Sequence, residues 1–189
     1  MKKTSFALVL FTSALVACNN ESSDPVEKAD SVNEVKQEST SQAIQTDEET
    51  TDFLVKAANG GMAEVDAGKL AESKATHADV KRFAMMMVND HTGANGMVKT
   101  LAAARNVTLP AAVSDDKKEN ATKLAEKTGK DFDKDYMDMM VKDHKETITL
   151  FEKGYDNSKD AEVKTFINNT LPKLKMHLDS AQAIQKMLK

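Results

Sequence analysis

The chain has 189 residues, of which 30% are charged and 5% aromatic, with no Trp and only three Pro. A composition so poor in helix-breaking residues favours one all-α domain with additional segments. The formal net charge is −4 and no stripe of basic residues stands out, which argues against a protein that binds nucleic acid. The single Cys excludes an internal disulfide.

The N-terminal segment resembles the leader of a bacterial lipoprotein. After a basic start, the apolar run 6–16 is too short to span a bilayer as a helix, and it indicates a signal peptide over 1–17. The Leu-Val-Ala-Cys ending resembles a lipobox, which implies cleavage before Cys18 and acylation of that residue. Several acyl chains hold a protein almost permanently on a membrane. Because Asn19 replaces the Asp typical of inner-membrane retention, we expect an outer-membrane lipoprotein facing the periplasm or the cell surface.

A polar segment separates this leader from the main domain. Residues 19–46 are rich in Ser, Glu, Gln and Asn and contain no aromatic side chain. Such a composition buries too little apolar surface to offset the entropy lost on ordering. We therefore expect the lipidated Cys18 and a disordered tether over 18–46. A capping box that starts at Thr46 then opens a helical domain over 47–189.

Apolar residues at alternating steps of three and four predict four long helices in this domain. Their expected ranges are 47–74, 77–106, 131–153 and 158–189. A short helix, 115–128, is expected in the connection between the second and third, and Pro172 should kink the last. The glycines of the first helix predict a close neighbouring helix or a bend: Gly60, Gly61 and Gly68.

The long connection between the second and third helices decides the topology. It comprises the 24 residues 107–130, which are enough to cross the length of a bundle. The third helix would then run parallel to the second, as in ferritin-like folds with one long crossover. A simple up-and-down bundle remains an alternative, because loop length alone does not distinguish the two.

A nine-residue pattern occurs twice, as F-A-M-M-M-V-N-D-H over 83–91 and as Y-M-D-M-M-V-K-D-H over 136–144. Each copy lies within a predicted long helix, on the second and on the third. Two copies are too few for a repeat array. We interpret them as helices related by approximate internal symmetry, each carrying an Asp-His pair at its end.

Four polar residues occupy core positions, one on each long helix: Glu64, His91, His144 and His177. At a rise of about 1.5 Å per residue, the crossover topology brings all four to a similar height in the bundle. The up-and-down topology separates His144 from His177 and forms no common site. Whether the candidate site forms therefore depends on the topology of the connection between the second and third helices.

The sequence favours a structural interpretation of these residues. Each His would be buried and neutral, and Glu64, Asp90, Asp143 or the backbone would satisfy its nitrogens in a polar layer that fixes the register of the bundle. The alternative is a site for copper, zinc or iron, in which imidazoles and a carboxylate converge on one ion. Its residues would be Glu64, His91, His144 and His177, supported by Met87, Asp90, Met140 and Asp143.

Two details bear on the choice of metal. Met87 and Met140 each lie four residues before a core His, a spacing that suits copper(I), although Met also fills irregular hydrophobic cores. A di-iron site of ferritin type needs paired Glu-x-x-His motifs. Val88 and Val141 stand where those Glu residues would be, which argues against di-iron oxidase chemistry.

Several motifs together resemble the family called domain of unknown function 4142. They are the lipobox, the two M-V-x-D-H runs ending at His91 and His144, L-P at 109–110, F-D-x-x-Y-M at 132–137 and L-P-x-L-x-x-H-L at 171–178. The resemblance covers 47–188. It implies a ferritin-like bundle exported from the bacterial cytoplasm, in a family labelled predicted outer-membrane proteins, and it implies no activity.

The sequence thus predicts a lipid-anchored, ferritin-like four-helix bundle with an extra short helix. Cys18 is used for lipidation, and no phosphate-binding loop or nucleophile elbow occurs. We expect no catalysis and no cofactor, but a binding or structural role, with a transition metal as the alternative. A protein or small-ligand partner would bind near the short helix and the kinked last helix.

Overall fold

The computed structural model describes residues 24–39 and 46–189, so the signal peptide and Cys18 lie outside the described residues. The elements are α1 Pro25–Ser39, α2 Glu48–Lys74, α3 Ala78–Ala104, α4 Asp115–Ala125, α5 Gly129–Asn157 and α6 Ala161–Met187. These residues contain no strand, which confirms the all-α class. None of these helices combines the length and apolar character needed to cross a membrane.

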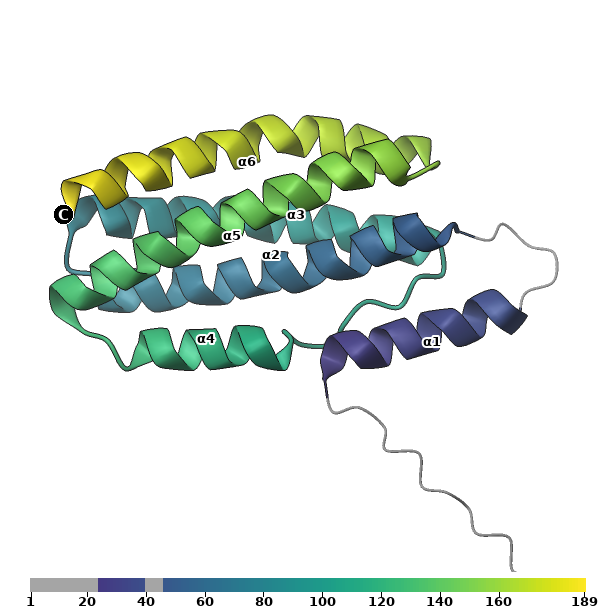
Figure 1. Ribbon diagram of the computed structural model, residues 1–189, viewed down its shortest axis with the longest axis horizontal. Helices are drawn as coiled ribbons and strands as arrows, with labels where there is room; N and C mark the ends of the chain where they lie inside the picture. Colours follow the sequence, from purple (N-terminus) through teal and green to yellow (C-terminus); the bar gives the residue numbers. More distant parts are fainter. Residues whose placement is uncertain (1–23, 40–45) are drawn as a thin grey trace, which may run out of the picture.

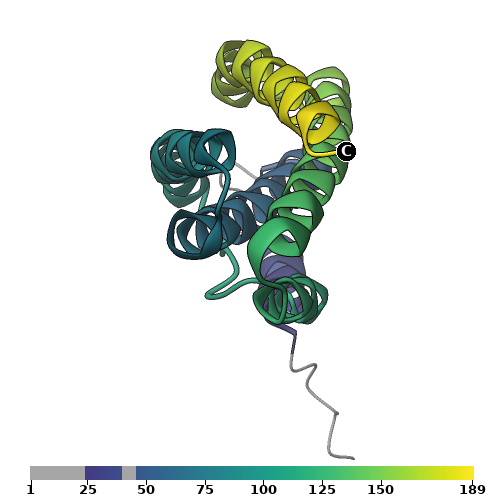
Figure 2. The same cartoon turned by 90° about the vertical axis from the view of Figure 1, so that its left-hand side faces the viewer.

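The four long helices form the bundle with one long crossover. Helix α2 is antiparallel to α3, and α5 is antiparallel to α6, while α3 and α5 run in the same direction (Figure 1). The connection between them carries α4 back along the outside of α2 and α5. Seen along its length, the bundle has α2, α3, α5 and α6 around a common interior (Figure 2). The crossover topology is therefore confirmed.

Side-chain caps begin α2 and α6. At the start of α2 the side chain of Asp47 accepts a hydrogen bond from the Thr50 amide at 3.0 Å, so the capping residue is Asp47 and not Thr46. The side chain of Asp160 accepts from two amides at the start of α6. Asp160 also pairs with the guanidinium of Arg105 at the end of α3. This pair fixes the end of α3 against the start of α6.

Two of the three glycines for which the sequence predicted a close neighbouring helix, Gly61 and Gly68, meet one, whereas a Cβ on Gly60 would meet nothing within 4 Å. A Cβ on Gly61 would lie 2.0 Å from the Asn95 side chain, and one on Gly68 would lie 2.8 Å from Val88, so α2 packs directly against α3. The predicted range 131–153 implied that the helix ends at Gly154, but it does not end there. Helix α5 continues to Asn157, and a Cβ on Gly154 would lie 2.5 Å from the ring of Phe53 on α2.

The interior has two hydrophobic clusters, one in each half of the bundle. One half contains Phe83, Phe132, Tyr136 and Met140, and the other contains Phe53, Phe151, Phe166 and Leu174. A layer of buried polar side chains lies between them, formed by Glu64, His91, His144 and His177. The four polar residues therefore interrupt an otherwise apolar core.

Helix α1 corrects the prediction of a disordered tether for the part of 18–46 that it occupies. Its residues Pro25–Ser39 form a helix that packs along the outside of the bundle (Figure 1). Asn33 is buried, and its side chain donates to the Thr108 carbonyl at 2.9 Å and accepts from the Thr108 amide at 2.7 Å. Hydrogen bonds to the crossover stabilise this helix, and the low apolar content of the segment gives no sign of them because they do not depend on apolar content.

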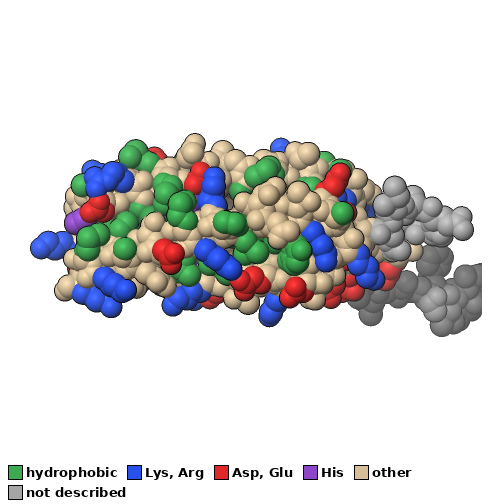
Figure 3. All heavy atoms as spheres, turned by 90° about the horizontal axis from the view of Figure 1, so that it is seen from above, with side chains coloured by type: hydrophobic (Ala, Val, Ile, Leu, Met, Phe, Trp, Pro, Cys, Tyr) green, Lys and Arg blue, Asp and Glu red, His purple; other side chains and the backbone are tan. Residues whose placement is uncertain are grey.

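On the face seen from above in Figure 3, the side of α6, acidic and basic side chains alternate with hydrophobic ones. The exposed hydrophobic residues of α6 include Met176 and Met187. This face carries no broad patch of one charge sign, in agreement with the interspersed charges of the sequence.

Candidate metal centre

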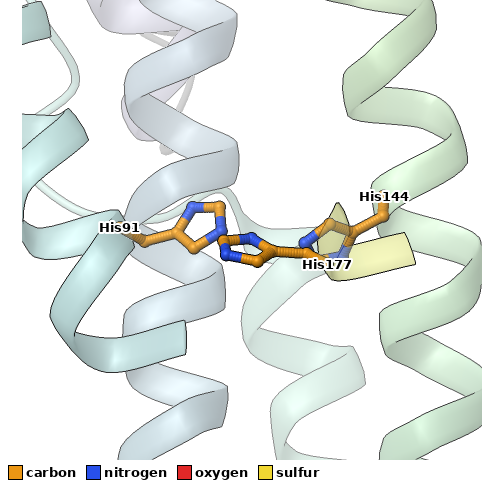
Figure 4. A group of neighbouring side chains, drawn as sticks. All are labelled: His91, His144 and His177. Carbon is orange, nitrogen blue, oxygen red and sulfur yellow. The ribbon is translucent and has the colours of Figure 1, made fainter. Parts of the chain in front are cut away.

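Three imidazoles meet at the centre of the bundle, from three different helices. His91 comes from α3, His144 from α5 and His177 from α6 (Figure 4). Their ring centroids lie 5.4 to 5.7 Å apart. With one ring nitrogen taken from each residue, the three nitrogens all lie within 4.8 Å of one another. In the described part of the chain this is the one such group of His, Cys, Asp or Glu.

The similar heights of these residues follow from the topology. His91 lies 13 residues after the start of α3 at residue 78, and His144 lies 15 after the start of α5 at residue 129. Because α3 and α5 are parallel, these similar depths bring the two imidazoles together, and α6 places His177 beside them. The motif repeat thus forms one shared site.

A hydrogen bond holds one nitrogen of each ring. His91 Nδ1 lies 2.9 Å from Glu64 Oε2, His144 Nδ1 lies 2.9 Å from the Met140 carbonyl, and His177 Nε2 lies 3.0 Å from Asp90 Oδ2. Carboxylates and carbonyls only accept hydrogen bonds, so each of these nitrogens carries the proton. In a neutral imidazole the other nitrogen then carries a lone pair.

The remaining nitrogens are therefore acceptors without a donor. His91 Nε2, His144 Nε2 and His177 Nδ1 are buried and have no hydrogen-bond partner among the described residues. Burial lowers the pKa of His144, and it lowers the pKa of His177 to about 4, with Asp90 acting in the opposite direction. His144 and His177 are thus neutral near pH 7. Where all three rings are neutral, their lone pairs repel one another unless a cation binds between them.

Glu64 supports two of the rings from α2. The carboxylate is 2% exposed, and its other oxygen lies 3.6 Å from His144 Nδ1. Burial by itself raises the pKa of Glu64, but the neighbouring His91, which donates a hydrogen bond to the carboxylate, outweighs burial and holds the pKa below its usual value. An ionised Glu64 orients His91 directly. A carboxylate that accepts a hydrogen bond from a metal-binding imidazole fixes the tautomer of the ring and increases its basicity.

The two Asp residues of the repeat have different roles. Asp90 accepts from His177 and from Lys173 Nζ, the latter at 3.1 Å. Asp143 instead accepts from Lys117 Nζ of α4 at 3.0 Å. Burial raises the pKa of Asp143, and Lys117 opposes that shift. Only the first Asp therefore touches an imidazole, and it touches one on another helix.

The side chains of Met87 and Met140, which the sequence suggested as support for a metal site, pack into the hydrophobic core. Met87 and Met140 are fully buried within the hydrophobic cluster of Phe83 and Tyr136. Met140 contributes to the site through its backbone carbonyl, which binds His144. The sequence did not single out Lys117, Lys173 or this carbonyl, because long-range contacts and backbone hydrogen bonds have no signature in residue order.

The three imidazole nitrogens suit the binding of a single metal ion. Three neutral imidazoles are typical ligands of zinc, copper, iron and nickel. Tetrahedral binding at about 2.1 Å requires nitrogens about 3.4 Å apart, so each ring would move inward by about 1 Å or less. Catalytic zinc sites use three protein ligands and leave a fourth position open. Glu64 lies behind the rings as a hydrogen-bond acceptor, so the site lacks the paired carboxylates of a di-iron centre.

Comparisons with known proteins agree with this architecture. The model of a family described as "Domain of unknown function (DUF4142)" matches residues 35–184. No curated protein matches the chain. Among solved structures, a DUF305 fragment from Deinococcus radiodurans is similar, with a TM-score of 0.68 and 7% identity, over 76% of this chain and 99% of that one. At this identity the likeness concerns the fold alone.

Proposed function

The chain belongs to the DUF4142 family, and we propose that it is a metal-binding protein in which His91, His144 and His177 hold one zinc or copper ion. The observation that carries this proposal is the set of three buried imidazole nitrogens without a donor. Their partners on the opposite side of each ring fix all three lone pairs toward a shared space. A cation between them satisfies every one of these atoms.

A purely structural polar layer accounts for the site less well. Such a layer needs its members hydrogen-bonded, because an unsatisfied buried polar group destabilises a fold by about 1–3 kcal/mol. Here Asp143 pairs with Lys117 and leaves the imidazoles with one partner each. The layer contains more acceptors than donors, and a bound cation removes that imbalance.

The direct test is metal content of the chain carrying Cys18→Ser, which cannot be acylated. After loading with Zn²⁺ or Cu²⁺ and removal of the excess, we expect one ion per chain. His91→Ala, His144→Ala and His177→Ala should each lose it while keeping the helical circular dichroism spectrum. His77→Ala is the matched control, because that imidazole caps α3 at the surface.

The outcomes separate the two interpretations. A folded wild-type chain that retains no stoichiometric ion would refute the proposal. So would equal metal loss in the His77→Ala control, since the ion would then be bound non-specifically. Earlier melting of the three variants without any change in metal content would favour the structural layer.

We further propose that the protein acts by binding, without catalysis, as an acylated protein of the bacterial cell envelope. The support is the sequence of 1–18, with its short apolar run and its single Cys. Incorporation of a labelled fatty acid into the wild-type chain and its absence in Cys18→Ser would agree with this location. A soluble, unlabelled wild-type chain would contradict it.

A further inference from the structure

We propose that a groove between α2, α3 and the crossover binds a free fatty acid, whose alkyl chain lies in the groove and whose carboxylate pairs with Lys99. The groove has a volume of about 470 Å³, within the range of roughly 300–1,000 Å³ that is typical of small-molecule sites. None of the four residues of the imidazole layer lines it. The inference therefore goes beyond the proposed metal site and does not rest on it.

The end of α3 and the crossover form one wall of the groove. Asn106 has a φ of 55°, and the Val107 amide donates to the Ala102 carbonyl at 2.9 Å, which is a left-handed helix end that reverses the chain. The crossover then reaches α2, where the Ser114 amide donates to Asn59 Oδ1 at 2.9 Å. Because both ends of this segment are held by hydrogen bonds, the wall is formed before a ligand binds.

The inner surface of the groove is mainly hydrophobic. Ala58 and Met62 contribute from α2, Ala102 contributes from α3, and Leu109 and Pro110 contribute from the crossover. The two small Ala side chains leave room between the helices. Burial of an alkyl chain against such a surface is favourable, because it removes apolar area from water.

The backbone of the crossover favours an alkyl chain over a peptide. The amide and the carbonyl of Thr108 are both bonded to the side chain of Asn33, the Val107 amide is bonded within the chain, and Pro110 has no N–H group. An extended peptide binds through hydrogen bonds to free backbone groups. An alkyl chain needs no such partner, so the wall suits hydrocarbon better.

The two polar residues of the groove select an acid. Lys99 is exposed and Asn95 is half-buried, one helical turn before it on the same face of α3. Lys99 forms no ion pair, and the Asn95 side chain no hydrogen bond, with another described residue. Among the described residues that line the groove, none is acidic. An ammonium and an amide side by side can both donate to one carboxylate.

The length of the groove sets the length of the chain that it takes. Its α3 side runs from Asn95 to Ala103, which is about 12 Å at a rise of about 1.5 Å per residue. A carboxylate at Lys99 and Asn95 therefore leaves space for several methylene groups along the apolar surface. A short acid such as hexanoate would fill only part of this space.

The test is isothermal titration calorimetry of the Cys18→Ser chain with hexanoate, octanoate and decanoate, below the concentrations at which they form micelles. We expect one decanoate per chain. The affinity should rise about two- to fourfold with each added methylene group, because full burial of one such group corresponds to about fourfold. Decyltrimethylammonium, which has the same chain and the opposite charge, should bind more weakly than decanoate.

Two variants with matched controls locate the ligand. Lys99→Gln should weaken decanoate binding about two- to fivefold, the range of an exposed ion pair, whereas Lys81→Gln changes an exposed Lys at the other end of α3 and should not. Ala103→Phe places a large side chain in the groove and should abolish binding. Its control is Ala104→Phe, at the next exposed position and outside the lining.

Several outcomes would overturn the inference. They include a folded chain that binds no decanoate, an Ala103→Phe variant that binds it unchanged, and equal binding of decanoate and decyltrimethylammonium. Binding by the Cys18→Ser chain but not by the acylated wild-type chain would assign the groove to the acyl groups of Cys18 instead. A chain that sediments as a dimer and becomes a monomer in Ala103→Phe would assign it to a second copy.

Discussion

The two Asp residues of the repeat offer a matched pair of variants, Asp90→Asn and Asp143→Asn. Each change removes one negative charge near the site and one partner of a Lys, Lys173 in the first case and Lys117 in the second. Only Asp90 touches an imidazole, at 3.0 Å from His177 Nε2. The difference between the two variants therefore isolates that single contact.

In Asp90→Asn the amide has one oxygen and one NH₂ group. The Lys173 ammonium attracts the oxygen, which leaves the NH₂ facing His177 Nε2. That nitrogen then becomes the acceptor, and the ring proton moves to Nδ1, where the metal would bind. Replacing a hydrogen-bond partner of a metal ligand lowers metal affinity about 10- to 100-fold, which corresponds to about 1.4–2.7 kcal/mol of binding free energy.

The assay is competition for Zn²⁺ with a chelating dye at pH 7, in the Cys18→Ser background. We expect the dissociation constant to rise about 10- to 100-fold in Asp90→Asn and to change less than about twofold in Asp143→Asn. Equal losses of Zn²⁺ affinity in both variants would show that the affinity depends only on the negative charge near the site and not on the contact between Asp90 and His177. An unchanged constant in Asp90→Asn would refute the assignment of His177 as a ligand held by Asp90.

Three further predictions concern the fold. Gly154→Ala should lower the free energy of unfolding by about 1–3 kcal/mol, because its Cβ would meet the Phe53 ring at 2.5 Å. Gly93→Ala, whose Cβ meets nothing within 4 Å, should raise it by up to about 1 kcal/mol, and equal effects in urea denaturation would contradict this packing. The Arg105 guanidinium, which pairs with Asp160, holds the pKa of the Asp160 carboxyl below its usual value. The stability that this pair adds is therefore present above about pH 4 and is lost as pH falls through the lowered pKa. Asp160→Asn should therefore cost about 1 kcal/mol at pH 7 and progressively less as pH falls through the lowered pKa, and a cost independent of pH would refute the pairing. Asn33→Ala should speed amide hydrogen exchange throughout α1 and leave the bundle protected, and unchanged exchange would show that other contacts hold the helix.

The sequence predicted the four long helices and the short one in the crossover, because helical periodicity and helix-breaking residues act over a few neighbouring positions. Its helix ends were less accurate where a long-range contact decided them. Gly154 was expected to end a helix, but its packing against Phe53 keeps it inside α5. Helix α1 was missed for the same reason, because its stability depends on Thr108, 75 residues away from Asn33.

The sequence also identified the four buried polar residues, since a polar side chain on an apolar stripe is visible in a single helix. It left open whether they meet and what satisfies them. The tertiary structure decided both, by running α3 and α5 in parallel and by pairing Asp143 with Lys117 rather than with an imidazole. The choice between a satisfied polar layer and a metal site depends on single hydrogen bonds between helices, and such bonds form only when the bundle is assembled.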